Sequence, residues 1–183
     1  MTQIKNKISI YKTNAFPTLK TKRLILRQLK TTDDQAIFKI RSNEIVYKYI
    51  SKETQNKIEE AQAFITKTNK GIANEEFLYW AISLKETQEL VGTICLWNFS
   101  KDKLIAEVGY ELLPAYHKKG IMNEALSKVL EFGFETLNLN SIEAFTHKEN
   151  KASKTLLIKH RFKLYKNRAD KGFPDNIIYI LTK

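Results

Sequence analysis

Apolar residues recur along the chain at two spacings, one typical of β-strands and the other typical of helices. Alternation is clearest over 104–113, where Ala106, Val108, Tyr110 and Leu112 share one side and Glu107, Gly109 and Glu111 share the other. Over 119–137 the apolar positions repeat every three or four residues and cover a wide surface. This pattern predicts a long helix packed on a sheet.

The same two spacings predict further elements along the chain. The expected strands are 23–29, 77–84, 90–97, 104–113, 141–147, 161–168 and 174–182, and the expected helices are 33–49, 55–69, 119–137 and 151–160. The order β-α-α-β-β-β-α-β-α-β-β indicates an α+β, or mixed α/β, fold around a mostly antiparallel sheet. The strand–helix–strand unit over 104–147 predicts one parallel pair with a right-handed crossover. Gly92, inside a strand, predicts a bulge or a close backbone approach.

Length and composition favour a single domain. With 183 residues, three prolines, six glycines and no Gly- or Pro-rich linker, the chain is expected to form one domain over 17–183, preceded by a polar leader over 1–16. No apolar run is long enough for a membrane span, and the leader lacks the apolar centre of a signal peptide. A single cysteine, Cys95, excludes an intramolecular disulfide, and the histidines do not cluster. We therefore expect a cytoplasmic protein without a metal site.

The charge is strongly positive and unevenly distributed. The net charge is +11, and residues 1–30 contain eight basic and no acidic side chains. A cationic protein attracts phosphate groups, either of nucleic acid or of a small cofactor. No aromatic residues alternate with the basic ones and no RNA-recognition motif is present, so a nucleic-acid partner is not favoured. A lysine-rich surface that serves only solubility is the plain alternative.

A short cationic loop precedes the long helix. The start of a helix presents unpaired main-chain N–H groups and a partial positive charge, which suits a phosphate. Gly120 allows close approach of an anion, and Lys118 and Lys119 add positive charge. The pattern predicts a phosphate site, with an ordinary basic turn between strand and helix as the alternative.

This region resembles a known motif. The segment from Glu107 to Ala125, EVGYELLPAYHKKGIMNEA, is similar to the acetyl-CoA motif of the GNAT superfamily, and more narrowly to the ribosomal-protein-alanine N-acetyltransferase branch. Three further segments match that branch in the same order: LKTKRLILR at 19–27, LVGTI at 90–94 and NKAS at 150–153. In the branch the phosphate loop reads W-G-K-G-Y-A, so Lys118 and Met122 replace small residues here.

The resemblance implies a GNAT fold and an acetyl-CoA-dependent N-acetyltransferase that acts by direct transfer. The acceptor would be a primary amine, such as the N-terminus of a ribosomal or other protein, or a small amine. The helices over 33–49 and 55–69 would form the acceptor side, and their many acidic residues suit a cationic amine. A non-catalytic acyl-CoA-binding or regulatory module of the same fold is the alternative. Whether the chain forms a homodimer is left open.

The resemblance also implies which residues hold the cofactor. They are Leu112, Leu113, His117, Lys118, Lys119, Gly120, Ile121, Met122, Asn123, Asn150 and Ser153. It further implies a bulge near Gly109, and a thioester lying in a cleft between the strands 104–113 and 141–147.

Two residues are expected to carry the chemistry. Amine acetylation requires a group that takes a proton, and Glu107 is the best candidate, with a solvent-facing carboxylate as the alternative. Glu111 shares its face but lies about 13 Å further along a regular strand, too far to act with it as a pair. By the resemblance, Ser153 lies near the departing sulfur as proton donor, with Tyr116 as a weaker candidate. The alternative for Ser153 is a first-turn residue bonded to its own backbone.

Overall fold

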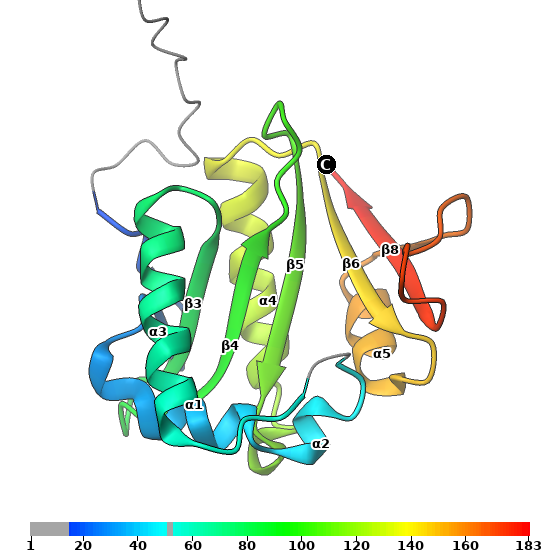
Figure 1. Cartoon of the computed structure of the whole chain (residues 1–183). Helices are drawn as coiled ribbons and strands as arrows, with labels where there is room; N and C mark the ends of the chain where they lie inside the picture. The colour runs from blue at the N-terminus through cyan, green and yellow to red at the C-terminus, as the bar shows by residue number, and fades with distance from the viewer. Residues whose placement is uncertain (1–14, 51–52) are drawn as a thin grey trace, which may run out of the picture.

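A computed structural model describes residues 15–50 and 53–183, in which β-strands form one sheet with helices on both faces (Figure 1). The strands are β1 (Leu19–Lys20), β2 (Leu24–Arg27), β3 (Leu78–Leu84), β4 (Leu90–Trp97), β5 (Ile105–Leu112), β6 (Ser141–His147), β7 (Lys163–Tyr165) and β8 (Asn176–Thr182). The α-helices are α1 (Asp34–Arg41), α2 (Glu44–Tyr47), α3 (Ile58–Ala73), α4 (Ile121–Glu131) and α5 (Lys151–Lys159). The order of elements confirms the predicted mixed α/β fold.

Within the described residues the sheet has eight strands in the order β1-β2-β3-β4-β5-β6-β8-β7, and every neighbouring pair except β5–β6 is antiparallel. The parallel pairing predicted for these two strands is confirmed, but it extends only from Ile105–Glu107 against Ser141–Glu143. Beyond that point β5 and β6 diverge (Figure 1). The sheet therefore opens in its middle, at the carboxyl ends of its two parallel strands.

Two apolar cores hold the layers together. The larger core lies between the sheet and α4, whose Ala125, Leu126 and Val129 are fully buried, and it extends to Leu157 of α5. The smaller core lies on the opposite face, where Ile37 and Ile40 of α1 meet α3. The wide apolar surface predicted for the central helix is thus buried against the sheet.

Several element ends differ from the sequence-based expectation. The first helical segment divides into α1 and α2 because the side chain of Asn43 accepts hydrogen bonds from the main-chain N–H groups of Ile45 and Val46 and so starts a new helix. The central helix begins at Ile121 and continues after Glu131 as a π-helical turn over Phe132–Thr136. These ends depend on local capping and hydrogen bonding, which the apolar spacing does not encode.

Gly92 is required by a close backbone approach, as its position in a strand predicted. A Cβ atom at this position would lie 2.4 Å from the carbonyl oxygen of Glu111, and the β3–β4 register shifts beside it, between Ile82 and Ser83. The bulge expected near Gly109 is not found in the β4–β5 pairing, whose register runs unbroken from Leu112 to Glu107. The regular alternation of β5 therefore continues, because no extra residue interrupts the ladder.

Most of the predicted leader over 1–16 lies outside the described residues. Of its last residues, Phe16 packs against Trp80, with 5.7 Å between the ring centroids. Within the described part of the chain, no helix is both long and apolar enough to cross a membrane.

Candidate active site

The divergence of β5 and β6 leaves a cleft of about 390 Å³ between them. Its lining includes consecutive residues of both strands, 107–110 and 144–147. Because successive side chains of a strand point to opposite faces, the cleft passes from one face of the sheet to the other. One end opens beside the start of α5, and the other opens on the face that carries α1 and α3.

Glu107 lines the cleft on the α1/α3 face. Burial of its carboxyl group raises its pKa to about 7, and the nearby charges of Asp170 and Glu143 act in the same direction. Asn98 donates a hydrogen bond from Nδ2 to Glu107 Oε2 at 3.4 Å, which lowers the pKa but does not outweigh burial. A carboxyl group with this pKa exchanges a proton readily near neutral pH.

Glu111 lies on the same face but does not line the cleft. Its carboxylate is 3.6 Å from a guanidinium nitrogen of Arg41, and it accepts hydrogen bonds from Tyr47 Oη and Thr93 Oγ1, each at 3.4 Å. The two strand carboxylates thus have different surroundings, and of the two Glu107 is the one that lines the cleft.

Ser153 and Tyr110 meet on the other side of the cleft. Their oxygens are 2.9 Å apart, and both residues line the cleft. Asn150 caps α5 by accepting a hydrogen bond from the main-chain N–H of Ser153 at 3.0 Å, which fixes the position of the serine. Burial raises the pKa of Tyr110 to about 12, so its phenol keeps its proton.

Sequence reasoning missed Tyr110, because its place on the apolar side of β5 marked it as a core residue. Tyr116, the weaker candidate, lies outside the cleft lining, and its hydroxyl donates a hydrogen bond to Glu89 Oε2 at 2.5 Å. His147 lines the cleft and stacks on Tyr49, with 5.3 Å between ring centroids. Within the described residues, no group of three His, Cys, Asp or Glu side chains could hold a metal ion.

The turn before α4 has the geometry of an anion site. Gly120 occupies the N-cap position with φ +72°, and no side chain of the described residues caps the helix there. Lys118 also adopts a left-handed conformation, with φ 59°. The side chains of Ile121 and Met122 are buried in the core, so they leave the first main-chain N–H groups of the helix uncovered. These residues fit the diphosphate of an acyl-CoA.

Arg23, which sequence reasoning did not single out, holds this turn in place. Its Nη1 donates a hydrogen bond to the carbonyl oxygen of Lys119 at 2.9 Å, and its Nε donates to Glu124 Oε2 at 2.6 Å. Thr21 Oγ1 also donates to Glu124, at 2.5 Å. Burial of the Glu124 carboxyl opposes its ionisation, but these hydrogen bonds outweigh burial and hold its pKa below the ordinary value. The sequence shows the segment Thr21-Lys22-Arg23 that makes these contacts, but its partner Glu124 lies far along the chain.

At the end of β5, Leu112 and Leu113, both predicted to hold the cofactor, direct their main-chain groups to opposite sides. The main-chain N–H of Leu113 donates to Val91 of β4 at 3.0 Å, and its side chain is buried in the smaller core. Since main-chain groups alternate in direction along a strand, those of Leu112 point toward the gap beside β6. The Leu112 carbonyl oxygen lies 2.9 Å from Nε2 of His117, so the histidine ring packs back onto the strand end.

Asn123 completes the predicted cofactor residues. It lies in the first turn of α4, and its Oδ1 is buried without a hydrogen-bond partner among the described residues. The structure therefore brings Gly120, Ile121, Met122 and Asn123 together at one helix start. Ser153 and Asn150 line the cleft between β5 and β6.

Comparison with known proteins agrees with this geometry. Residues 23–163 match the family model described as an acetyltransferase (GNAT) domain. The chain is 37% identical over 147 residues to the uncharacterized N-acetyltransferase YoaA of Bacillus subtilis (strain 168), a match that covers 80% of this chain and 83% of that protein.

Solved structures share the fold. The ribosomal-protein-S5-alanine acetyltransferase from Vibrio fischeri has a TM-score of 0.76 at 20% identity, covering 91% of this chain and 96% of that one. Mycobacterium smegmatis RimJ, solved in complex with CoA-disulfide, has a TM-score of 0.74 at 22% identity, covering 87% of this chain and 81% of that one.

Proposed function

The chain belongs to the GNAT acetyltransferase family, and on that basis we propose that it transfers the acetyl group of acetyl-CoA directly to a primary amine. The observation that carries this proposal is the pairing of Glu107 with Ser153 and Tyr110 across one cleft. A group with a pKa near 7 stands on one side, and protonated hydroxyl groups stand on the other. Such an arrangement suits a transfer in which one proton is removed and another is supplied.

The cofactor would lie along the end of β5 and the start of α4. The main-chain N–H groups of Ile121, Met122 and Asn123 would bind the diphosphate, with Lys118 and Lys119 adding positive charge. Main-chain groups of Leu112 would hold the pantetheine arm, which leads into the cleft toward Ser153. When bound, acetyl-CoA supplies an acetyl group on a thioester and leaves as a thiol.

Glu107 would act as the base. An amine must be neutral to form the new C–N bond, and it enters largely as an ammonium ion, so a proton must leave it. Glu107 is partly buried and its pKa lies near 7, so at neutral pH a large share is ionised and can accept that proton. Trp97, opposite Glu107 on β4, and Asn98 line the same end of the cleft and would help position the amine.

Ser153 would supply the proton that the sulfur needs when the C–S bond breaks. Its hydroxyl is hydrogen-bonded to Tyr110, whose high pKa keeps it protonated, so a proton lost from Ser153 can be replaced from the phenol. The Asn150 cap holds Ser153 at the start of α5, and the positive end of that helix favours a developing negative charge on the sulfur.

The proposal is tested by measuring thiol release from acetyl-CoA in the presence of primary amines. The panel should include peptides with free N-termini, because one solved structure of the same fold is named a ribosomal-protein-S5-alanine acetyltransferase. We expect release that depends on the amine and falls strongly in Glu107→Gln. Titration calorimetry with acetyl-CoA and CoA runs in parallel. Tight binding without turnover of any amine would instead favour the non-catalytic acyl-CoA-binding module.

A further inference from the structure

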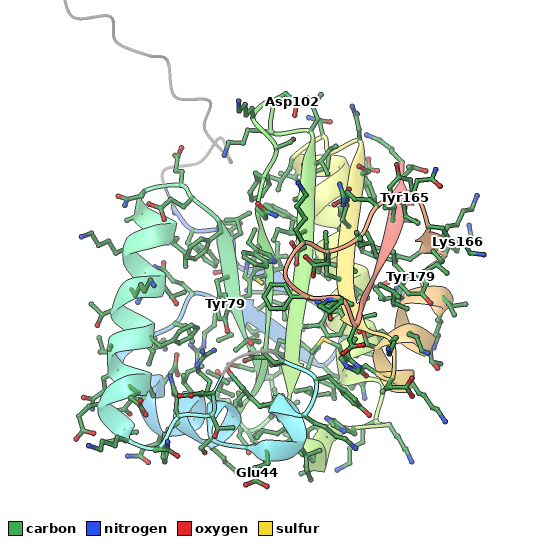
Figure 2. All side chains as sticks on the ribbon, turned by 45° about the vertical axis from the view of Figure 1, so that its right-hand side comes forward. Glu44, Tyr79, Asp102, Tyr165, Lys166 and Tyr179 are labelled. Atoms are coloured by element: carbon green, nitrogen blue, oxygen red, sulfur yellow. The ribbon has the colours of Figure 1, made fainter. Side chains whose placement is uncertain are left out.

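The acceptor end of the cleft contains a second carboxylate besides Glu107. Asp170 comes from the loop between β7 and β8, residues 166–175, which crosses the front of β6 toward β5 (Figure 2). Both Asp170 and Glu107 line the cleft, and their charges interact. Two elements far apart in the sequence thus place two acidic groups around one space.

Asp170 is held in position by its loop. Its Oδ2 accepts a hydrogen bond from Asn176 Nδ2 at 2.8 Å, and its main-chain oxygen accepts one from Phe173 at 3.1 Å. Arg168 anchors the same loop to β6, because it forms an ion pair with Glu143 and lies 5.5 Å from the ring centroid of Phe145. The carboxylate of Asp170 is therefore part of the cleft wall.

The neighbouring carboxylates are neutralised by cations, but those of Glu107 and Asp170 are not. Glu143 pairs with Arg168, Glu111 lies 3.6 Å from Arg41, and Asp175 lies 2.6 Å from Lys148. Within residues 15–50 and 53–183, no ion pair within 4.0 Å involves the two acids of the cleft. In a chain with a net charge of +11, a cavity that concentrates uncompensated negative charge is suited to a cationic ligand.

Of these two negative charges, acetyl transfer neutralises only that of Glu107. Glu107 takes up the proton of the reacting ammonium group, after which the amine is neutral and Glu107 is protonated. Asp170 takes no part in this proton transfer, so its carboxylate is left to pair with a second cation at the cleft. The exposed rings of Trp97 and Phe173, each 43% exposed, line the same space and offer aromatic faces to such a cation and to the alkyl chain beside it.

We propose that Asp170 makes the acceptor site selective for primary amines that carry a second positive charge a few bonds from the reacting nitrogen. The inference rests on the proposed function and specifies its substrate class. Two sources share this chemistry, a short aliphatic diamine and a peptide N-terminus followed by a basic side chain. Both place a second cation beside Asp170 while the first amine reaches Glu107.

The test compares matched acceptors by kcat/KM in the thiol-release assay. Putrescine is compared with 1-aminobutane, and an alanyl-lysyl peptide with an alanyl-norleucyl peptide, so that each pair differs in one charge. We expect a preference of about five- to tenfold for the dication in at least one pair. The pair that shows it identifies the source of the second charge.

Asp170→Asn is the decisive variant. It should reduce the ratio of kcat/KM for the dication to kcat/KM for the monocation to about one. Asp175→Asn, a change in the same loop at a residue paired with Lys148, should keep this ratio. Equal rates within both pairs, or a preference that survives Asp170→Asn, would overturn the inference while leaving amine acetylation intact. Absence of thiol release with every amine would count against the proposed function itself.

Discussion

Arg23 and Glu124 lie 101 residues apart in the chain and are joined by two hydrogen bonds, from Arg23 Nε at 2.6 Å and from its main-chain N–H at 2.8 Å. Through a third bond, to the carbonyl oxygen of Lys119, Arg23 ties the start of β2 to the turn that precedes α4. The side chain of Arg23 is 45% exposed, and an exposed ion pair contributes little to stability. Its main effect is expected on the geometry of the turn.

Replacing Arg23 with Gln should therefore weaken cofactor binding more than folding. We expect the KM for acetyl-CoA to rise about five- to tenfold, with a much smaller change in kcat, because the main-chain donors of the turn lose their alignment. The control is Lys22→Gln, which removes a charge from the neighbouring exposed position. With an acetyl thioester of N-acetylcysteamine as donor, which has no phosphate groups, Arg23→Gln and Lys22→Gln should have the same activity. An equal loss with both donors would contradict the assignment.

Glu107→Gln tests the base. Turnover should fall by about 10²- to 10³-fold with little change in the Kd for acetyl-CoA, since Gln cannot take up the proton of the amine. In the wild-type protein kcat/KM should decrease below pH 7, where Glu107 becomes protonated, and the variant should lack this dependence on Glu107. The measurement is a pH–rate profile of both proteins. A variant with the rate and profile of the wild type would show that another group is the base.

The same carboxyl group should make folding stability depend on pH. Its pKa is raised from 4.5 to about 7 in the folded state, so between these values the folded protein binds more protons than the unfolded chain. The contribution of Glu107 to the free energy of unfolding is therefore full below pH 4.5 and is lost as the pH rises toward 7. Urea unfolding at pH 5 and pH 7.5 should show a smaller difference for Glu107→Gln than for the wild type. An identical difference would contradict the raised pKa.

Tyr110→Phe and Ser153→Ala should impair the same step, the transfer of a proton to the departing sulfur. Each should lower kcat about 10- to 100-fold, and the double variant should lose much less than the product of the two effects, because both hydroxyl groups belong to one hydrogen-bonded unit. A double-mutant cycle on kcat measures this coupling. Independent, multiplicative effects would argue against a shared proton path.

Lys118→Gly should stabilise the fold. A lysine with φ 59° is strained, and glycine removes that strain, for an expected gain of about 1 kcal/mol in the free energy of unfolding. Lys103, in the turn between β4 and β5, has φ 61° and provides the matched control. Lys103→Gly should give a similar gain with unchanged affinity for acetyl-CoA, whereas Lys118→Gly also removes a charge beside the cofactor turn. Denaturant unfolding measures the free energy of unfolding, and titration calorimetry measures the affinity for acetyl-CoA. Unchanged stability of both variants would contradict the strain at these lysines.

The spacing of apolar residues was sufficient to predict the mixed sheet, the parallel strand pair and the order of the longer elements, but not the two-residue strand β1 or the separate helix α2. Alternation over 104–113 placed Glu107 on a polar face, and the basic turn at Gly120 marked the start of a helix. These features could be predicted because strand and helix periodicity, capping and chain reversal depend on near neighbours in the sequence. The bulge expected at Gly109 was wrong, since an unbroken β4–β5 ladder is a property of the paired strands.

What only the tertiary structure decided are the contacts between distant segments. The sequence determined which side chains the strand β5 carries, but not that Tyr110 would meet Ser153, that Arg23 would hold the turn before α4, or that a loop after β7 would bring Asp170 beside Glu107. Each of these contacts depends on where separate elements dock on the sheet. The elevated pKa of Glu107 has the same origin, because it reflects burial by residues from several strands and one loop rather than any local pattern of charge.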